Sequence, residues 1–373
     1  MGRGILEMPK KGYLILENGD IYEGDSFSID REIAGEVVFN TGMVGYPEGF
    51  TDPSYYGQIL VATYPLIGNY GVPPAGKSAR MPENFESDRM QISGLVVSRY
   101  EENKSHYQAK EVLASWMKRE KVPGLSGIDT RSLTKTLRTT GVMKGLITFQ
   151  KPPDKFGGFS FKDINRENLV PFVSCRKPEI YGNGRLRVLF IDCGLKYNQI
   201  RLMLNYDTTV IRVPWNYNPY QEKKPPDFDT VFISNGPGDA RTMPETVETV
   251  RQSLAKKIPT FGICLGHQIM ALAAGGDIYK LKYGHRSQNQ PVRDVVSGKC
   301  FITSQNHGYS VVEKSIPKDW QIWFTNLNDG TNEGIRHKKL PFFCVQFHPE
   351  ASPGPTDTNW LFDYYFRVVK KWL

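Results

Sequence analysis

The sequence predicts an α/β protein with two domains: an N-terminal mixed α/β domain, and a C-terminal domain with a mostly parallel sheet flanked by helices. Residues 1–175 contain short strands and turn signals, whereas residues 186–373 begin with apolar strands that alternate with amphipathic helices. Strands separated by helices are typical of βαβ units. A polar stretch that contains Gly and Pro, at 176–185, lies between the halves and is expected to be a linker. A chain of 373 residues can bury two ordinary cores.

The first domain is expected to open with a β-hairpin. Residues 13–17 and 21–24 have strand character, and Asn18-Gly19 between them readily adopts the positive φ angles of a tight turn. Asp129 or Thr130 is a suitable N-cap for a helix. The other elements expected here are strands at 35–40 and 58–63, rich in β-branched residues, and helices at 107–120 and 130–139.

The second domain is expected to place its chemistry where parallel strands end, because open α/β sheets bind ligands at the carboxyl ends of their strands. The predicted strands are 186–191, 208–213, 228–234, 258–263 and 341–347, and the predicted helices are 196–204, 244–256 and 267–274. Cys264, Gly236 and His348 each follow one of these strands. The sequence therefore predicts that the three residues share one edge of the sheet.

Cys264 lies in Gly262-Ile263-Cys264-Leu265-Gly266, between an apolar run and a predicted helix. A nucleophile on a sharp strand-to-helix turn has a strained backbone, and glycines two residues away on either side let neighbouring chain pass close by. The start of a helix favours negative charge, and the amide of Leu265 can donate to an oxyanion on an attacked carbonyl. A cysteine after an apolar strand can instead be an inert core thiol.

A nucleophilic cysteine needs a base and a third group that orients the base. His348-Pro349-Glu350 directly follows the apolar strand at 341–347, so His348 is expected at the carboxyl end of that strand. Glu350, two residues further on, can reach the imidazole ring. Together with the two glycines around Cys264, this pair favours a catalytic thiol over an inert one.

Four C-terminal motifs together resemble those of class I (triad) glutamine amidotransferases: 262–266, 234–239, 304–309 and 348–350. In the first half, the segments 35–41, 51–55, 65–71 and 127–131 resemble the N-terminal domain of the carbamoyl-phosphate synthetase small subunit. The match follows the order of that family, and only about ten initial residues and stretches near 75–88 and 152–168 lie outside it. Segments such as 195–201 are more similar to the eukaryotic, glutamine-dependent type of the pyrimidine pathway.

The resemblance implies a role for each residue of the site. Cys264, His348 and Glu350 would form the catalytic triad, and the amides of Gly236 and Leu265 would form the oxyanion hole. A surface turn is the alternative for 234–239, and a simple turn cap is the alternative for Ser54, which belongs to the predicted first domain. Tyr309 stands where the family usually has phenylalanine. The implied glutamine-binding residues are Ser54, Gly236, Gly238, Leu265, Gln268, Asn306, Gly308 and Tyr309.

The resemblance further implies an activity and a partner. The chain would hydrolyse L-glutamine through a glutamyl thioester and deliver ammonia to a synthetase that makes carbamoyl phosphate from bicarbonate and ATP. No ATP-binding motif is present in the sequence, so ATP and Mg²⁺ are expected only in the partner, either a large subunit or a fused synthetase domain. No cofactor and no metal are expected in this chain.

Composition argues against several other classes. The 47 basic and 39 acidic residues give a formal charge of +8, but the basic residues are dispersed, so nucleic-acid binding is not expected. No apolar run is long enough to span a bilayer, and the first ten residues do not resemble a signal peptide. The five cysteines are scattered without a C-x-x-C pair, which argues against a disulfide framework or zinc cluster and favours a reducing, cytoplasmic setting.

Two alternative functions remain open at this stage. One is a triad amidotransferase that serves another acceptor, which the N-terminal motifs argue against. The other is a catalytically silent docking or regulatory subunit, which the complete set Cys264, His348 and Glu350 argues against.

Overall fold

The computed structural model describes residues 9–152, 159, 161 and 163–373. The first residues and part of the 152–168 stretch therefore lie outside the described residues. The chain forms two compact units that interleave along the sequence. The first unit comprises 1–41, 57–74 and 92–164, and the second comprises 42–56, 75–91 and 165–373.

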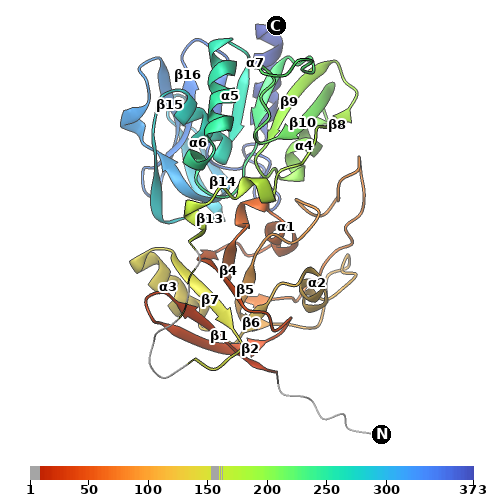
Figure 1. The fold of residues 1–373 in the computed structure, drawn as a ribbon, viewed down its shortest axis with the longest axis vertical. Coiled ribbons are helices and arrows are strands. Elements are labelled where there is room, and N and C mark those ends of the chain that lie inside the picture. Colours follow the sequence, from red (N-terminus) through yellow and green to blue (C-terminus); the bar gives the residue numbers. More distant parts are fainter. Residues whose placement is uncertain (1–8, 153–158, 160, 162) are drawn as a thin grey trace. The chain divides into compact units, whose positions relative to one another are not determined.

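The first unit is a closed β-barrel with the strand order β1-β2-β6-β5-β4-β3-β7 (Figure 1). The predicted hairpin is confirmed, because β1 and β2 pair antiparallel with Ile15 opposite Ile21. Closure comes from β7, which pairs antiparallel with both β1 and β3. The strands are β1 (Lys11–Leu16), β2 (Ile21–Ser26), β3 (Ile33–Asn40), β4 (Gln58–Ile67), β5 (Gly94–Tyr100), β6 (Gly124–Ser126) and β7 (Met143–Thr148).

Among the described residues of this unit, two segments form α-helices. Helix α3 (Thr130–Thr140) begins as predicted, because the side chain of Asp129 accepts a hydrogen bond from Ser132 N at 2.8 Å. Helix α2 spans only Leu113–Glu120, shorter than the 107–120 predicted. The preceding backbone is extended at Glu111, where it forms a β-bridge with Val72.

The second unit is built on a mixed sheet with the order β14-β13-β15-β16-β17-β12-β11-β9-β10-β8. The predicted parallel arrangement is confirmed for β17-β12-β11-β9-β10. Antiparallel strands extend this parallel centre at both edges. The strands are β8 (Glu179–Gly182), β9 (Leu186–Asp192), β10 (Thr208–Pro214), β11 (Thr230–Ile233), β12 (Thr260–Ile263), β13 (Ile278–Asp294), β14 (Cys300–Val311), β15 (Trp320–Asn326), β16 (Asn332–His337) and β17 (Phe342–Val345).

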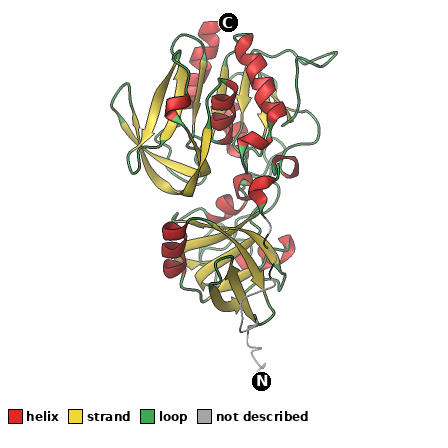
Figure 2. Cartoon of the chain, turned by 60° about the vertical axis from the view of Figure 1, so that its left-hand side comes forward, coloured by secondary structure: helices red, strands yellow, loops and turns green. Residues whose placement is uncertain are grey.

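Helices cover both faces of the parallel strands (Figures 1 and 2). Successive residues of β9 alternate between two cores: Phe190 packs with α4 and α7, whereas Ile191 packs with α5 and α6. The helices are α4 (Tyr197–Met203), α5 (Pro244–Ala255), α6 (Leu265–Ala273) and α7 (Trp360–Trp372). Among the described residues, no helix is long and apolar enough to cross a membrane.

Two segments expected in the first domain, 42–56 and 75–91, belong to the second unit. They contain helix α1 (Tyr46–Phe50) and join each other through Gln91 N, which donates to Phe50 O at 2.7 Å. They are anchored further by Arg201 of α4, whose guanidinium bonds the buried carboxylate of Glu86 at 2.5 Å. Ser54, which the sequence analysis assigned to the first domain, therefore lies in the same unit as Cys264.

The predicted linker also has regular structure in part. Residues 179–182 form the edge strand β8, because their backbone pairs antiparallel with β10, with Tyr181 opposite Val210. These residues lie within the second compact unit.

Candidate active site

Cys264 occupies a strained turn between β12 and α6. Its φ of 54° and ψ of −103° lie outside the regions that non-glycine residues favour. A Cβ atom on Gly262 would lie 2.5 Å from Gly266 O, and one on Gly266 would lie 2.3 Å from Ile233 O. The close packing predicted from the two glycines is therefore confirmed.

The strained turn is tied to its surroundings on both sides. Cys264 N donates to Val345 O of β17 at 2.8 Å, and Sγ lies 3.7 Å from the backbone oxygen of Asn306 in β14. The residue is almost completely buried, with 2% of its surface exposed. These contacts hold the thiol at the carboxyl ends of β12 and β17, as predicted.

His348 and Glu350 form a buried pair, with Nδ1 of the ring 2.6 Å from Oε1 of the carboxylate. Burial disfavours the charged ring, but its interactions with Glu350 and Cys264 outweigh that effect and raise the pKa of His348 to about 10. His348 Nε2 is buried and makes no hydrogen bond with any described residue. That nitrogen is therefore available to exchange a proton, while Nδ1 is held by the carboxylate.

Glu350 has partners that the sequence analysis did not assign. Lys196 Nζ lies 3.7 Å from Oε1, and Gln199 Nε2 donates to the same oxygen at 3.1 Å. Burial disfavours the carboxylate, but His348 and Lys196 together lower the pKa of Glu350. Both partners lie at the start of α4. The sequence analysis noted this segment only for its resemblance to one type of the family and assigned it no role in the site.

The amides of Gly236 and Leu265 are suited to bind an oxyanion. Neither amide donates to another described residue. A Cβ atom on Gly236 would lie 1.9 Å from Cys193 O, so only glycine fits where β11 leads into this loop. Gly238, two residues on, has a φ of 87° that also favours glycine. The roles of the Gly236 and Leu265 amides as oxyanion donors stay predictions.

A hydrogen-bonded network joins Ser54 and Asn306 through two residues that sequence reasoning missed. Asp52 accepts from Asn306 Nδ2 at 2.9 Å and from Ser54 N at 2.9 Å. Asn235 Nδ2 donates to Ser54 Oγ at 3.0 Å, and Asn235 Oδ1 accepts from Gln199 Nε2 at 3.0 Å. The network therefore connects Ser54 with the residues around Glu350. No local sequence signal marks the contacts of Asp52 with Asn306 or of Asn235 with Ser54 and Gln199, because these partners are distant along the chain.

Gln268 and Tyr309 also lie together, as the resemblance implied. Gln268 Nε2 donates to Tyr309 O at 3.3 Å and to Gln346 Oε1 at 3.2 Å, while Gln268 Oε1 is buried without a hydrogen-bond partner among the described residues. The Tyr309 side chain is buried. Gly308 is packed tightly, since a Cβ atom there would lie 3.3 Å from Arg286 Nη2.

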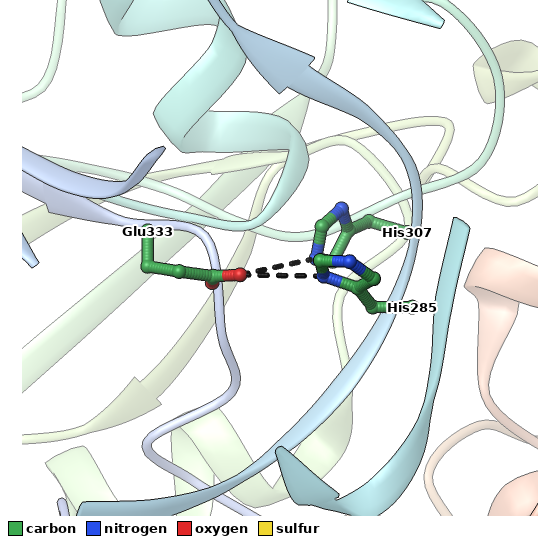
Figure 3. A group of neighbouring side chains, drawn as sticks. All are labelled: His285, His307 and Glu333. Carbon is green, nitrogen blue, oxygen red and sulfur yellow. Dashed lines mark ion pairs between the residues drawn. The ribbon is translucent and has the colours of Figure 1, made fainter. Parts of the chain in front are cut away.

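One group of side chains has a donor set suited to a metal ion. His285, His307 and Glu333 are buried, and one ligand atom from each lies within 4.8 Å of the others (Figure 3). Burial disfavours a charged ring, but Asp329 and Glu333 raise the pKa of His285 to about 9, so the surrounding oxygens favour a positive charge here. The sequence analysis missed this group because its members come from three separate strands.

The C-terminal half of the chain belongs to the class I glutamine amidotransferases, as its match to that family shows. The sequence pattern of that family, "Glutamine amidotransferase class-I", matches residues 189–368, and that of "Carbamoyl-phosphate synthase small chain, CPSase domain" matches residues 14–147. With the relatives below, these matches show that the chain belongs to the carbamoyl phosphate synthase small chain family.

Similar proteins occur both as separate small chains and as parts of much longer proteins. The carbamoyl phosphate synthase small chain of Pyrococcus furiosus is 43% identical over 97% of this chain and 98% of its own length. The carbamoyl phosphate synthase arginine-specific small chain of Neosartorya fischeri is 45% identical over 96% of this chain and 79% of its length. Multifunctional protein ura1 of Schizosaccharomyces pombe is 45% identical over 96% of this chain, which spans only 17% of that relative.

Proposed function

We propose that this chain is the glutaminase component of a glutamine-dependent carbamoyl-phosphate synthetase. The observation that carries the proposal is the buried His348–Glu350 pair at 2.6 Å, whose imidazole interacts with Cys264, a cysteine held in a strained strand-to-helix turn. A strained turn at a reactive residue is kept only where the surrounding structure enforces it. Here the tight packing of Gly262 and Gly266 provides that enforcement.

The reaction begins with attack on the side-chain amide of L-glutamine. The Cys264 thiolate forms a bond to the amide carbon while His348 holds the proton, and the carbonyl oxygen becomes an oxyanion. The amides of Gly236 and Leu265 donate to that oxyanion, a contribution of about 2.7–4 kcal/mol per donor in comparable sites. Glu350 keeps Nδ1 of His348 in place, so Nε2 faces the reacting atoms.

The intermediate then collapses in two stages. His348 gives its proton to the departing nitrogen, the carbon–nitrogen bond breaks, and ammonia leaves a γ-glutamyl thioester on Cys264. Water, deprotonated by His348, attacks the thioester carbon, the carbon–sulfur bond breaks, and glutamate is released with the thiolate restored. Ammonia and glutamate account for all atoms of glutamine and one water.

Glutamine is held, in this proposal, by residues around the Asp52 network. Ser54, Gln268, Asn306, Gly308 and Tyr309 would contact it together with the backbone of Gly236, Gly238 and Leu265. Asn306 Nδ2 is already bonded to Asp52, so its contribution to glutamine binding would come mainly through its backbone. Gln268 Oε1, which is buried without a partner among the described residues, is suited to accept from a substrate N–H.

The proposed partner is a synthetase subunit or fused domain that binds ATP and Mg²⁺ and converts bicarbonate and ammonia to carbamoyl phosphate. The relatives support either arrangement, because some are small chains and others are multifunctional proteins. The cytoplasmic location predicted from the sequence belongs to the same proposal, and the five free cysteines favour it.

The deciding experiment measures glutamate release from glutamine by wild type and Cys264→Ala, each with and without a cognate synthetase. We expect release that requires Cys264, increases with the partner and is coupled to carbamoyl phosphate. Cys264→Ser should lose glutamine use but spare ammonia-dependent synthesis. If wild type releases no glutamate while its partner remains active with ammonia, the docking-subunit alternative is correct and the glutaminase proposal is wrong.

A further inference from the structure

We propose that His285, His307 and Glu333 form a binding site for a divalent first-row transition-metal ion such as Zn²⁺, with Gln305 as a fourth ligand. Two imidazole nitrogens and a carboxylate are a ligand set that zinc accepts. The three residues come from β13, β14 and β16, and none of them is a member of the triad; Figure 3 shows their side chains. The proposal does not depend on the glutaminase assignment.

The orientation of the two rings is the first argument. His285 Nε2 lies 2.8 Å from Asp329 Oδ2, and His307 Nδ1 lies 2.8 Å from Tyr309 O. A carboxylate and a carbonyl oxygen can only accept, so each of these ring nitrogens carries a hydrogen. Metal-binding histidines are commonly held in this way, with the distal ring nitrogen bonded to a carboxylate or a backbone carbonyl.

The convergence of the remaining atoms is the second argument. The other nitrogens, His285 Nδ1 and His307 Nε2, face Glu333 Oε1 at 3.3 and 4.0 Å. Gln305 Oε1 lies 2.9 Å from the first nitrogen and 3.1 Å from the second, while its amide nitrogen donates to Thr303. The two ring nitrogens thus both face the same two oxygens, an arrangement that a shared cation would stabilise.

The separations suit a small ion. Zinc bonds to nitrogen and oxygen at about 2.0–2.2 Å, which places the ligands of a tetrahedral site about 3.3 Å apart. His285 Nδ1 and Glu333 Oε1 already have this spacing. His307 Nε2 and Glu333 Oε1 are 4.0 Å apart and would have to approach each other by less than an ångström. Asn326 Nδ2 donates to Glu333 Oε1 at 3.0 Å and would keep that carboxylate oriented.

Burial supplies the third argument. Glu333 is completely buried, and its second oxygen, Oε2, has no hydrogen-bond partner among the described residues. An incompletely paired carboxylate is costly in the interior, and coordination of an ion would offset that cost. The competing possibility is that a proton alone bridges these groups.

The test uses the full chain after treatment with a chelator, titrated with Co²⁺ as a spectroscopic substitute for Zn²⁺. We expect one equivalent of bound Co²⁺ with the intense visible absorption of a four-coordinate site, displaced by Zn²⁺ and free of the near-ultraviolet charge-transfer band of thiolate ligands. Glu333→Gln and His285→Gln should lose this equivalent. Asp329→Asn should weaken affinity by about 10–100-fold, because it removes only the support of a ligand.

His337→Gln is the matched control, because His337 pairs with Asp319 at 3.1 Å outside the cluster and should leave binding unchanged. Anomalous diffraction from cobalt in wild-type crystals provides a second test that needs no variant to fold. Density between His285, His307 and Glu333 would support the proposal. The proposal fails if wild type binds no stoichiometric Co²⁺, if cysteines bind the ion, or if the folded Glu333→Gln and His285→Gln variants still bind it. In any of these cases the three side chains are held together by a shared proton and not by a metal ion.

Discussion

Replacing Gly236 by alanine tests the oxyanion hole most directly. A Cβ atom at this position would lie 1.9 Å from Cys193 O and 2.9 Å from Leu265 Cδ2. Ordinary contacts begin at 3.4 Å, so the loop must move by the difference, about 1.5 Å, away from a rigid backbone carbonyl. A hydrogen bond of about 2.7–3.1 Å does not survive such a displacement.

Loss of one oxyanion donor costs about 2.7–4 kcal/mol in the transition state, so kcat for glutamine hydrolysis should fall by about 10²–10³-fold. KM should change less, because the donor acts on charge that develops only in the transition state. The assay is steady-state glutamate release in the presence of the synthetase partner. Ammonia-dependent carbamoyl phosphate synthesis, measured in parallel, should be retained.

Gly49→Ala is the matched control for Gly236→Ala, because a Cβ atom on Gly49 meets no atom within 4 Å. The control should keep wild-type kcat. Overpacking at Gly236 should also cost about 1–3 kcal/mol of unfolding free energy, which urea denaturation measures separately. If folded Gly236→Ala keeps kcat within about threefold of wild type, or raises only KM, the amide of Gly236 is not an oxyanion donor.

Three other outcomes concern the stability of the second unit. The folded-state pKa of His348, about 10, lies above its ordinary value of 6.5. The contribution of the protonated ring to the free energy of unfolding is therefore complete below about pH 6.5 and is lost as the pH rises through 10. Urea unfolding across this pH range should show that the free energy of unfolding declines in wild type and declines less in Glu350→Gln. Equal declines in the two proteins would contradict the pairing of His348 with Glu350. Asp52→Ala should lower the free energy of unfolding in urea by about 1–3 kcal/mol and raise KM for glutamine, because Ser54 N and Asn306 Nδ2 lose their acceptor. An unchanged KM would show that this network does not contribute to substrate binding. Phe232→Ala should cost about 3–5 kcal/mol in the same unfolding assay, because the ring is fully buried in the core, and unchanged stability would contradict that packing.

The features of the site that are local in sequence were predictable from it. The turn at Cys264 depends on glycines two residues away, and the His348–Glu350 contact spans two residues, so each pattern is visible in a short motif. The βαβ alternation likewise predicted the parallel centre of the sheet, because each strand and helix has its own periodicity.

Features that depend on long-range pairing were not predictable in the same way. Strand β13 changes register with β14 between Lys280 and His285, so sequence spacing does not show that His285 lies opposite His307. Asp52 reaches Asn306 across most of the chain, and no residue near either one signals that contact. Helix α2 also begins later than expected, because backbone pairing at Glu111 opposes local helical preference.

The interleaving of the two units limits how this protein can be divided or recombined. A fragment that begins at residue 186 carries Cys264 and His348 but lacks Asp52, Ser54 and Glu86, which belong to the same compact unit. Asn306 and Arg201 would then lose their buried carboxylate partners. The C-terminal half is therefore not a transferable module, and a gene fusion that preserves the site must include the N-terminal sequence. The multifunctional relative from Schizosaccharomyces pombe agrees, since its similarity covers 96% of this chain and so includes the N-terminal sequence.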